Sequence, residues 1–117
     1  MGFASFLKSL PIDLGQGDLR GTTKGKQIAL SFVPEGTGKV ALDVGCREGI
    51  QTEWLKSKGY RVEPIDVEKA YPEAVIVDVN QGLPYANGEF DLIWCSEVIE
   101  HLENPENFRN EVNRVLK

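Results

Sequence analysis

Cysteine, histidine and long apolar runs are scarce in this sequence of 117 residues. Its two cysteines and one histidine are too few for a disulfide scaffold or for a zinc site built from cysteine pairs. No apolar run approaches the roughly 20 residues that a membrane-spanning helix requires. Basic residues are not in excess either, since 18 acidic and 13 basic side chains give a net charge of −5. These absences argue against a disulfide-rich secreted domain, a membrane span and a nucleic-acid-binding surface.

The cysteines and the first residues of the chain predict a cytoplasmic location. Cys46 and Cys95 lie far apart and outside any Cys-x-x-Cys pair, which is typical of free thiols in a reducing compartment. The N-terminus has no charged segment followed by a long apolar stretch, the pattern of a secretory signal. Apolar residues at helical spacing over residues 3–10 predict a short helical arm that Pro11 ends. We interpret this arm as a packing element, with a substrate lid or a membrane-surface contact as alternatives.

The order of the predicted elements indicates a single α/β domain over residues 1–117. Compact apolar runs that end at an acidic residue or a glycine predict strands buried in a parallel sheet, and segments with helical spacing lie between them. Residues 1–38 form an N-terminal arm and connector in this interpretation, and residues 39–117 form the α/β unit. The expected strands cover residues 40–44, 60–65, 74–77 and 90–95, and the expected helices cover residues 24–33, 49–58 and a final segment that Asn104 caps and Pro105 begins.

Each predicted helix carries apolar positions that we expect to face the sheet. The expected inward residues are Ile28, Ala29, Phe32 and Val33 in the first helix, Ile50, Trp54 and Leu55 in the second, and Phe108, Val112, Val115 and Leu116 in the third. Thr22 or Thr23 is expected to cap the first helix, because a hydroxyl there can accept a hydrogen bond from a free backbone N–H. The helices therefore predict an apolar layer on the sheet.

Residues suited to ligand binding lie where the predicted strands end, the edge at which open α/β sheets bind their ligands. Gly45 follows the first strand and permits a tight turn close to a ligand. Asp66 follows the second strand and is placed to accept hydrogen bonds from two ribose hydroxyls. The glycine spacing in residues 45–49 does not match the Gly-x-Gly-x-x-Gly turn that binds a dinucleotide pyrophosphate. Asp43 would repel a pyrophosphate but suits a cationic amino group.

Five segments, taken in order, resemble the class I S-adenosylmethionine-dependent methyltransferases of the methyltransferase type 11 kind. Residues 40–49, Val-Ala-Leu-Asp-Val-Gly-Cys-Arg-Glu-Gly, resemble the first motif of that family, and residues 65–66 resemble its ribose-binding acid. The other segments are residues 77–80 with 82–85, which resemble the adenine-binding segment, residues 90–95, which resemble the fourth strand, and residues 97–102, which resemble the helical turn after it.

The resemblance implies a Rossmann-like α/β/α fold of three layers, with a parallel sheet in the strand order 3-2-1-4. Members of the family usually continue into a fifth strand and two more, beginning about where this sequence ends. We therefore expect residues 39–117 to form the cofactor-binding half of the fold, without the later strands.

The resemblance also implies that the domain transfers a methyl group from S-adenosylmethionine to a small-molecule acceptor. In the family, the first motif holds the methionyl end of the cofactor, and the segments after the second and third strands hold its ribose and adenine. The implied cofactor-binding residues are Asp43, Gly45, Cys46 and Gly49 in the first motif, Asp66 and Val67 after the second strand, Asp78 and Val79 after the third, and Cys95 at the end of the fourth.

Two residues depart from the family pattern. Arg47 stands where the first motif usually has its middle glycine, and Pro64 stands where a glycine often precedes the ribose-binding acid. An arginine at this turn either crowds the methionyl group or points into solvent and leaves only backbone strain. A proline near a strand end is tolerable. Arg47 is therefore the departure that bears on cofactor binding.

Glu97, Glu100 and His101 have a spacing that places them on one side of a helix. Two carboxylates and an imidazole can hold a metal ion, and the spacing resembles the metal site of quinone-biosynthesis and small-RNA 2′-O-methyltransferases. We favour a simpler interpretation, in which the acids lie at a helix start and the histidine caps or packs, so no metal ion is expected. His101 is also the candidate general base, although an activated sulfonium does not require one.

An alternative interpretation is a truncated or degenerate domain without catalysis, which acts as a binding or assembly module. Arg47 and the missing later strands support it. A sheet that ends at the fourth strand leaves an apolar edge at residues 92–94, which a homodimer or a partner chain would cover. The expected partners are therefore a small-molecule acceptor and a second copy or another chain, whereas nucleic acid and a membrane span are not expected.

Overall fold

The computed structural model describes residues 24–96 and 98–117, so the predicted N-terminal arm, its connector, the capping threonines and Glu97 lie outside the described residues. The predicted alternation of helices and strands is confirmed, although β3 and β4 are shorter than predicted. The elements are α2 (Lys24–Ser31), β1 (Val40–Val44), α3 (Ile50–Ser57), β2 (Arg61–Asp66), β3 (Val75–Ile76), η1 (Val79–Gln81), β4 (Leu92–Cys95), η2 (Ile99–His101) and α4 (Pro105–Val115).

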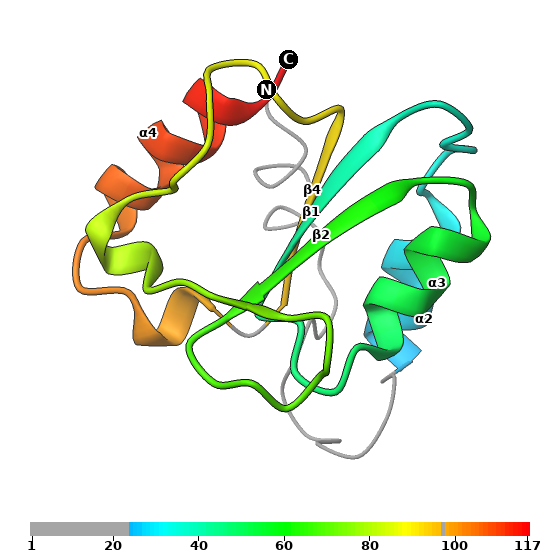
Figure 1. The fold of residues 1–117 in the computed structure, drawn as a ribbon, viewed down its shortest axis with the longest axis horizontal. Helices are drawn as coiled ribbons and strands as arrows, with labels where there is room; N and C mark the ends of the chain where they lie inside the picture. The colour runs from blue at the N-terminus through cyan, green and yellow to red at the C-terminus, as the bar shows by residue number, and fades with distance from the viewer. Residues whose placement is uncertain (1–23, 97) are drawn as a thin grey trace.

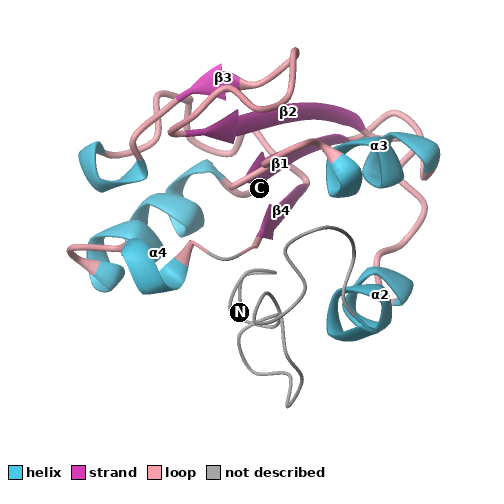
Figure 2. Cartoon of the chain, turned by 90° about the horizontal axis from the view of Figure 1, so that it is seen from below, coloured by secondary structure: helices cyan, strands magenta, loops and turns pink. Residues whose placement is uncertain are grey.

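The four strands form one parallel sheet in the order β3-β2-β1-β4, which confirms the predicted order. β1 is paired along its length with β2 on one side and, from Ala41 onward, with β4 on the other. α2 and α3 cover one face of the sheet and α4 covers the opposite face (Figures 1 and 2). A parallel sheet covered on both faces has largely apolar strands, as β4 does throughout and β1 does except at Asp43.

The core is divided into two parts by the sheet, because successive side chains of a strand point to opposite faces. Leu42 and Val44 of β1 pack on the α4 side, and Ala41 packs on the side of α2 and α3. α4 contributes its apolar stripe as predicted, with Phe108, Val112 and Val115 buried. None of the described helices is long and apolar enough to cross a membrane.

The predicted inward face is wrong for three helix residues: Ile28, Phe32 and Ile50 are 40%, 58% and 41% exposed. α2 ends at Ser31, so Phe32 and Val33 both lie beyond the helix, and of the two only Val33 is buried. In α3 the buried positions are Gln51, Thr52 and Leu55. The Thr52 hydroxyl donates a hydrogen bond to the buried Asp43 carboxylate, which turns Ile50 outward. Polar pairing, not apolar periodicity, therefore sets the rotation of α3.

The last residues of the chain lie beside the start of β4. Phe90 and Leu116 form a parallel bridge, in which the Phe90 N–H donates to the Val115 carbonyl at 2.9 Å and the Lys117 N–H donates to the Phe90 carbonyl at 2.9 Å. Beyond this bridge, within residues 24–96 and 98–117, β4 pairs with β1 alone. Residues 92–94 of the predicted fourth strand therefore lie at an edge of the described sheet.

Candidate functional site

A cleft of about 490 Å³ lies at the carboxyl ends of the four strands. The last residues of β1 and β2 and the residues that follow β3 and β4 all contribute to its lining. This is the edge at which open α/β sheets bind their ligands. Six of the residues predicted from the sequence line the cleft: Gly45, Asp66, Val67, Asp78, Val79 and His101.

The Asp66 carboxylate is held in one orientation by backbone N–H groups. Its Oδ2 accepts a hydrogen bond from the Arg47 N–H at 2.9 Å, and its Oδ1 accepts from the N–H groups of Val67 and Glu68 at 2.7 and 3.5 Å. These donors belong to the main chain and cannot rotate away as side chains can. The end of β2 therefore presents a fixed carboxylate in the cleft lining, next to the turn that follows β1.

The turn over residues 45–49 has three residues in the left-handed region, with φ of 78° at Gly45, 48° at Arg47 and 88° at Gly49. The glycines adopt this conformation without a Cβ clash, whereas for arginine it costs roughly 1–2 kcal/mol. Arg47 is also half-buried and lines the cleft. The departure from the family pattern therefore has two consequences, a strained backbone and an arginine at the cleft.

Both glycines of this turn are closely packed by the protein itself. A Cβ at Gly45 would lie 2.6 Å from the Ser96 carbonyl oxygen and 2.8 Å from the Val98 side chain, so the end of β1 and the segment after β4 meet without room for a side chain. A Cβ at Gly49 would overlap the Tyr71 ring. The second contact shows that Gly49 is required by a tyrosine of the loop after β2, which the sequence pattern did not indicate.

Asp43 is fully buried beneath α3 and does not line the cleft. Its Oδ2 accepts a hydrogen bond from the Thr52 hydroxyl at 2.5 Å, and its Oδ1 has no hydrogen-bond partner among the described residues. Burial raises the pKa of Asp43 to about 7, although the Thr52 hydrogen bond opposes this shift. A carboxyl group that is partly protonated near neutral pH is expected where one oxygen is buried without a partner.

The two cysteines form no disulfide and lie in different packing clusters. Cys46 is buried with Tyr71 and Ala74, and burial raises the pKa of its thiol to about 12, so the group is a neutral packing residue. Cys95 is half-buried and packs on the α4 side of the sheet. Four predicted cofactor contacts lie outside the cleft lining, so their role in binding stays a prediction: Asp43, Cys46, Gly49 and Cys95.

The segment after β3 is positioned by α4. Asp78 begins the short helix η1 and accepts the Asn80 N–H at 3.0 Å. Downstream, the Leu83 N–H donates to Glu111 at 2.9 Å, and Arg114 donates to Glu111 at 2.8 Å and to the Leu83 carbonyl at 2.9 Å. The Arg114 guanidinium holds the pKa of Glu111 at about 2. This charged contact fixes the loop that follows the Asp78 side of the cleft.

Two of the three candidate metal residues, Glu100 and His101, lie in a short helix. Within the described residues the segment contains a single 3-10 turn, Ile99–His101, in place of the expected α-helical turn, so the α-helical spacing argument does not apply. Glu100 and His101 are both exposed, and His101 lines the cleft. Glu97 lies outside the described residues. No group of three potential metal-binding side chains occurs in residues 24–96 and 98–117.

Several cleft residues were not predicted from the sequence. Ser96 follows β4 directly, is 3% exposed, and has a hydroxyl without a hydrogen-bond partner among the described residues. Val98 and Leu102 add apolar lining. Ser96 could have been predicted as a cleft residue, because it directly follows a predicted strand, as Gly45 and Asp66 do.

Comparisons with known proteins identify the family of this α/β domain. Residues 42–117 match the family described as "Methyltransferase domain". The chain belongs to this family, and the predicted Rossmann-like fold with strand order 3-2-1-4 is confirmed.

Individual relatives are similar over part of their length. The ubiquinone biosynthesis O-methyltransferase of Azoarcus sp. is 35% identical over 83 residues, which cover 59% of this chain and 36% of that protein. An S-adenosylmethionine dependent methyltransferase from Mesorhizobium loti superposes with a TM-score of 0.67 at 23% identity, covering 77% of this chain and 48% of the other. Haemonchus contortus phosphoethanolamine N-methyltransferase 1, solved with phosphoethanolamine and S-adenosylhomocysteine, superposes with a TM-score of 0.73 at 20% identity, covering 98% and 29%. The chain therefore spans less than half the length of each.

The raised pKa of Asp43 predicts a specific pH dependence of stability. Because its folded pKa of about 7 exceeds its ordinary value of 3.8, the folded state binds the proton more tightly than the unfolded chain. The stability that this proton contributes to the folded state is fully present below the ordinary pKa of 3.8 and is lost as the pH rises through about 7. We expect Asp43→Asn, which keeps an oxygen for Thr52, to remove it.

Urea unfolding at about pH 5 and about pH 8 measures the effect. The free energy of unfolding of the Asn variant relative to wild type should rise by at least about 1 kcal/mol between these two pH values. A constant difference between the two proteins would contradict the assignment of the titration to Asp43.

Proposed function

We propose that this domain binds S-adenosylmethionine in the cleft and acts in methyl transfer to a small-molecule acceptor. The observation that carries the proposal is the Asp66 carboxylate, which backbone N–H groups fix in the cleft lining. A carboxylate at the end of the second strand suits the two hydroxyls of a ribose. Membership of the methyltransferase family supports this ligand, as does the S-adenosylhomocysteine bound to the Haemonchus protein.

The other cleft residues fit the remaining parts of the cofactor by their chemistry. Asp78 accepts the Asn80 N–H, which orients its carboxylate for the amino group of an adenine, and Val79 offers an apolar surface for the ring. Ser96 lines the cleft, and its buried hydroxyl, which has no hydrogen-bond partner among the described residues, offers a donor and acceptor for the methionyl part. Asp43 is buried behind this region and does not line it.

S-adenosylmethionine supplies a methyl group on an activated sulfonium when it is bound. The residues of the domain therefore have to orient the ligand and exclude water, and the reaction does not require a strong base. His101 lines the cleft and is the only histidine of the chain, so it is the candidate to receive a proton from a hydroxyl acceptor. The small-molecule class of the acceptor follows the Azoarcus relative. The cytoplasm is the proposed location, in keeping with two cysteines that form no disulfide.

The binding proposal predicts that Asp66→Asn weakens binding of S-adenosylhomocysteine by at least roughly tenfold, since hydrogen bonds to a charged group are lost. The asparagine oxygen can accept from one side only, either the Arg47 N–H or the N–H groups of Val67 and Glu68, so denaturant unfolding has to show that the variant is folded. Glu106→Gln, an equivalent change at the exposed start of α4, should leave affinity unchanged. Isothermal titration calorimetry measures all three proteins. A folded wild-type domain that does not bind at millimolar ligand would refute the proposal.

Arg47→Gly separates the proposed function from the non-catalytic alternative. Glycine relieves the left-handed strain, so we expect the free energy of unfolding to rise by about 1 kcal/mol. Under the proposed function the affinity for S-adenosylhomocysteine should change by less than roughly threefold. A gain of tenfold or more would mean that the arginine blocks the site, and would favour a degenerate domain. Calorimetry and denaturant unfolding of the same variant give both values.

We also propose that a strand from a second copy or another chain covers the outer edge of β4. The parallel bridge between Phe90 and Leu116 supports this, because it begins strand pairing on that side while Leu92–Cys95 continue past it. An apolar edge strand is a template for such pairing. Multi-angle light scattering should therefore detect a dimer or larger species. A monomer across the accessible concentration range would count against pairing between copies.

A further inference from the structure

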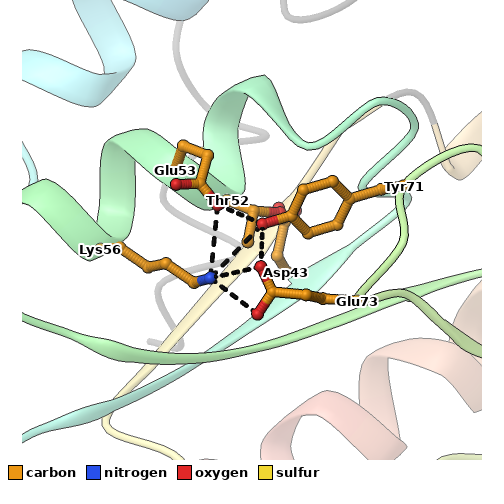
Figure 3. Close-up of polar contacts among 6 residues, drawn as sticks. All are labelled: Asp43, Thr52, Glu53, Lys56, Tyr71 and Glu73. Carbon is orange, nitrogen blue, oxygen red and sulfur yellow. Dashed lines mark hydrogen bonds and ion pairs between the residues drawn. The ribbon is translucent and has the colours of Figure 1, made fainter.

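Tyr71 lies in the loop between β2 and β3 and packs against the start of α3. Its side chain is largely buried, and its ring occupies the space that a side chain at Gly49 would need. Its hydroxyl lies at hydrogen-bond distance from the carboxylates of Glu53 and Glu73, and 2.6 Å separates it from the Glu73 oxygen. Figure 3 shows these side chains pointing toward one another from α3 and from the loop. The tyrosine therefore connects two segments that are distant in sequence.

Lys56 completes this connection from α3. Its Nζ lies 2.7 and 2.9 Å from the two Glu73 oxygens, 3.3 Å from Glu53 and 3.4 Å from the Tyr71 hydroxyl (Figure 3). Hydrogen bonds from Lys56 and Tyr71 hold the pKa of Glu73 below its usual range, and those from Tyr71 and Lys56 do the same for Glu53. Each exposed ion pair alone contributes little, but together they join the loop to the helix at one buried ring.

The loop that carries Tyr71 is a wall of the cleft. Val67, Glu68 and Ala70 line the cleft, and no helix or strand is formed between β2 and β3. The loop is tied to the glycine-rich turn at both ends, at Asp66 through the Arg47 N–H and at Tyr71 through the contact with Gly49. The position of this wall relative to the turn therefore depends on two contacts.

We propose that Tyr71 is a positioning residue, which together with Glu53, Lys56 and Glu73 holds residues 67–70 in place against the adenosine part of the cofactor. The inference rests on the proposed function. If the wall occupies its binding position for only a fraction of the time, the measured affinity falls in proportion to that fraction. The glycine at position 49 then has a different role from the direct cofactor contact predicted from the sequence, because it makes room for the ring.

The test uses two variants of the Tyr71 contact and one control variant. Tyr71→Phe keeps the ring over Gly49 and removes the hydroxyl, and Lys56→Met removes the ammonium group. Tyr60→Phe is a matched control, because the Tyr60 ring also fills the space beside a glycine, Gly36, and its hydroxyl donates to the Pro34 carbonyl at 3.0 Å. Tyr60 precedes β2, so this control lies at the opposite edge of the sheet from the cleft.

Calorimetry with S-adenosylhomocysteine and with 5′-methylthioadenosine should show that Tyr71→Phe and Lys56→Met weaken both ligands by the same factor, roughly three- to tenfold, since both ligands contain adenosine. Tyr60→Phe should bind both ligands as wild type does, even where thermal unfolding shows an equal loss of stability. Without ligand, amide hydrogen exchange over residues 67–74 should be faster than in wild type for Tyr71→Phe and Lys56→Met, and unchanged for Tyr60→Phe.

Unchanged affinity in both Tyr71→Phe and Lys56→Met would overturn the inference. So would a loss of affinity in Tyr60→Phe as large as the loss in those two variants. If wild type binds neither ligand, the proposed function fails, and hydrogen exchange still tests the contact: unchanged exchange over residues 67–74 would overturn it as well.

Discussion

The structure depends on how closely the turn over residues 45–49 packs between its neighbours. Carbonyl and carboxylate groups at the end of β2 accept its N–H groups, with Ile65 binding those of Gly45 and Cys46 and Asp66 binding that of Arg47. The segment after β4 and the Tyr71 ring leave no room for side chains at its two glycines. Backbone hydrogen bonds that are shielded from water rigidify such a turn. The turn over residues 45–49 therefore fixes where α3 begins and where the floor of the cleft lies.

Burial of Asp43 follows from the same arrangement and is its main energetic cost. A carboxyl group in the middle of the central strand, with one oxygen unpartnered among the described residues, loses several kcal/mol of hydration if it stays charged. Protonation near neutral pH and the Thr52 hydrogen bond reduce that cost. The domain would be more stable with an apolar residue at position 43. The placement of the acid behind the proposed ligand site is therefore better explained by function than by folding.

Much of the fold follows from local sequence, whereas part of the site does not. Apolar runs such as residues 40–44, each ending in glycine or an acid, were sufficient to predict the strands, and the family resemblance was sufficient to predict their order. The rotation of α3 was not predictable from apolar spacing, because it follows from the Thr52–Asp43 hydrogen bond. The role of Tyr71 could not be predicted, because its contact with Gly49 joins residues on either side of α3 and β2 and leaves no periodic pattern in the sequence. Pairwise contacts of this kind become visible only once the chain is folded.

Arg47 shows how one family feature can be replaced while the geometry is kept. The left-handed backbone costs roughly 1–2 kcal/mol for a residue other than glycine. The Arg47 N–H donates to a carboxylate, and hydrogen bonds to charged groups contribute about 1.5–3 kcal/mol. The two terms are of similar size, so the turn keeps its shape without the middle glycine, and Asp66 is the residue that makes this possible. The acid proposed to bind a ribose therefore also stabilises the turn beside it, which couples the departure at position 47 to the proposed ligand site.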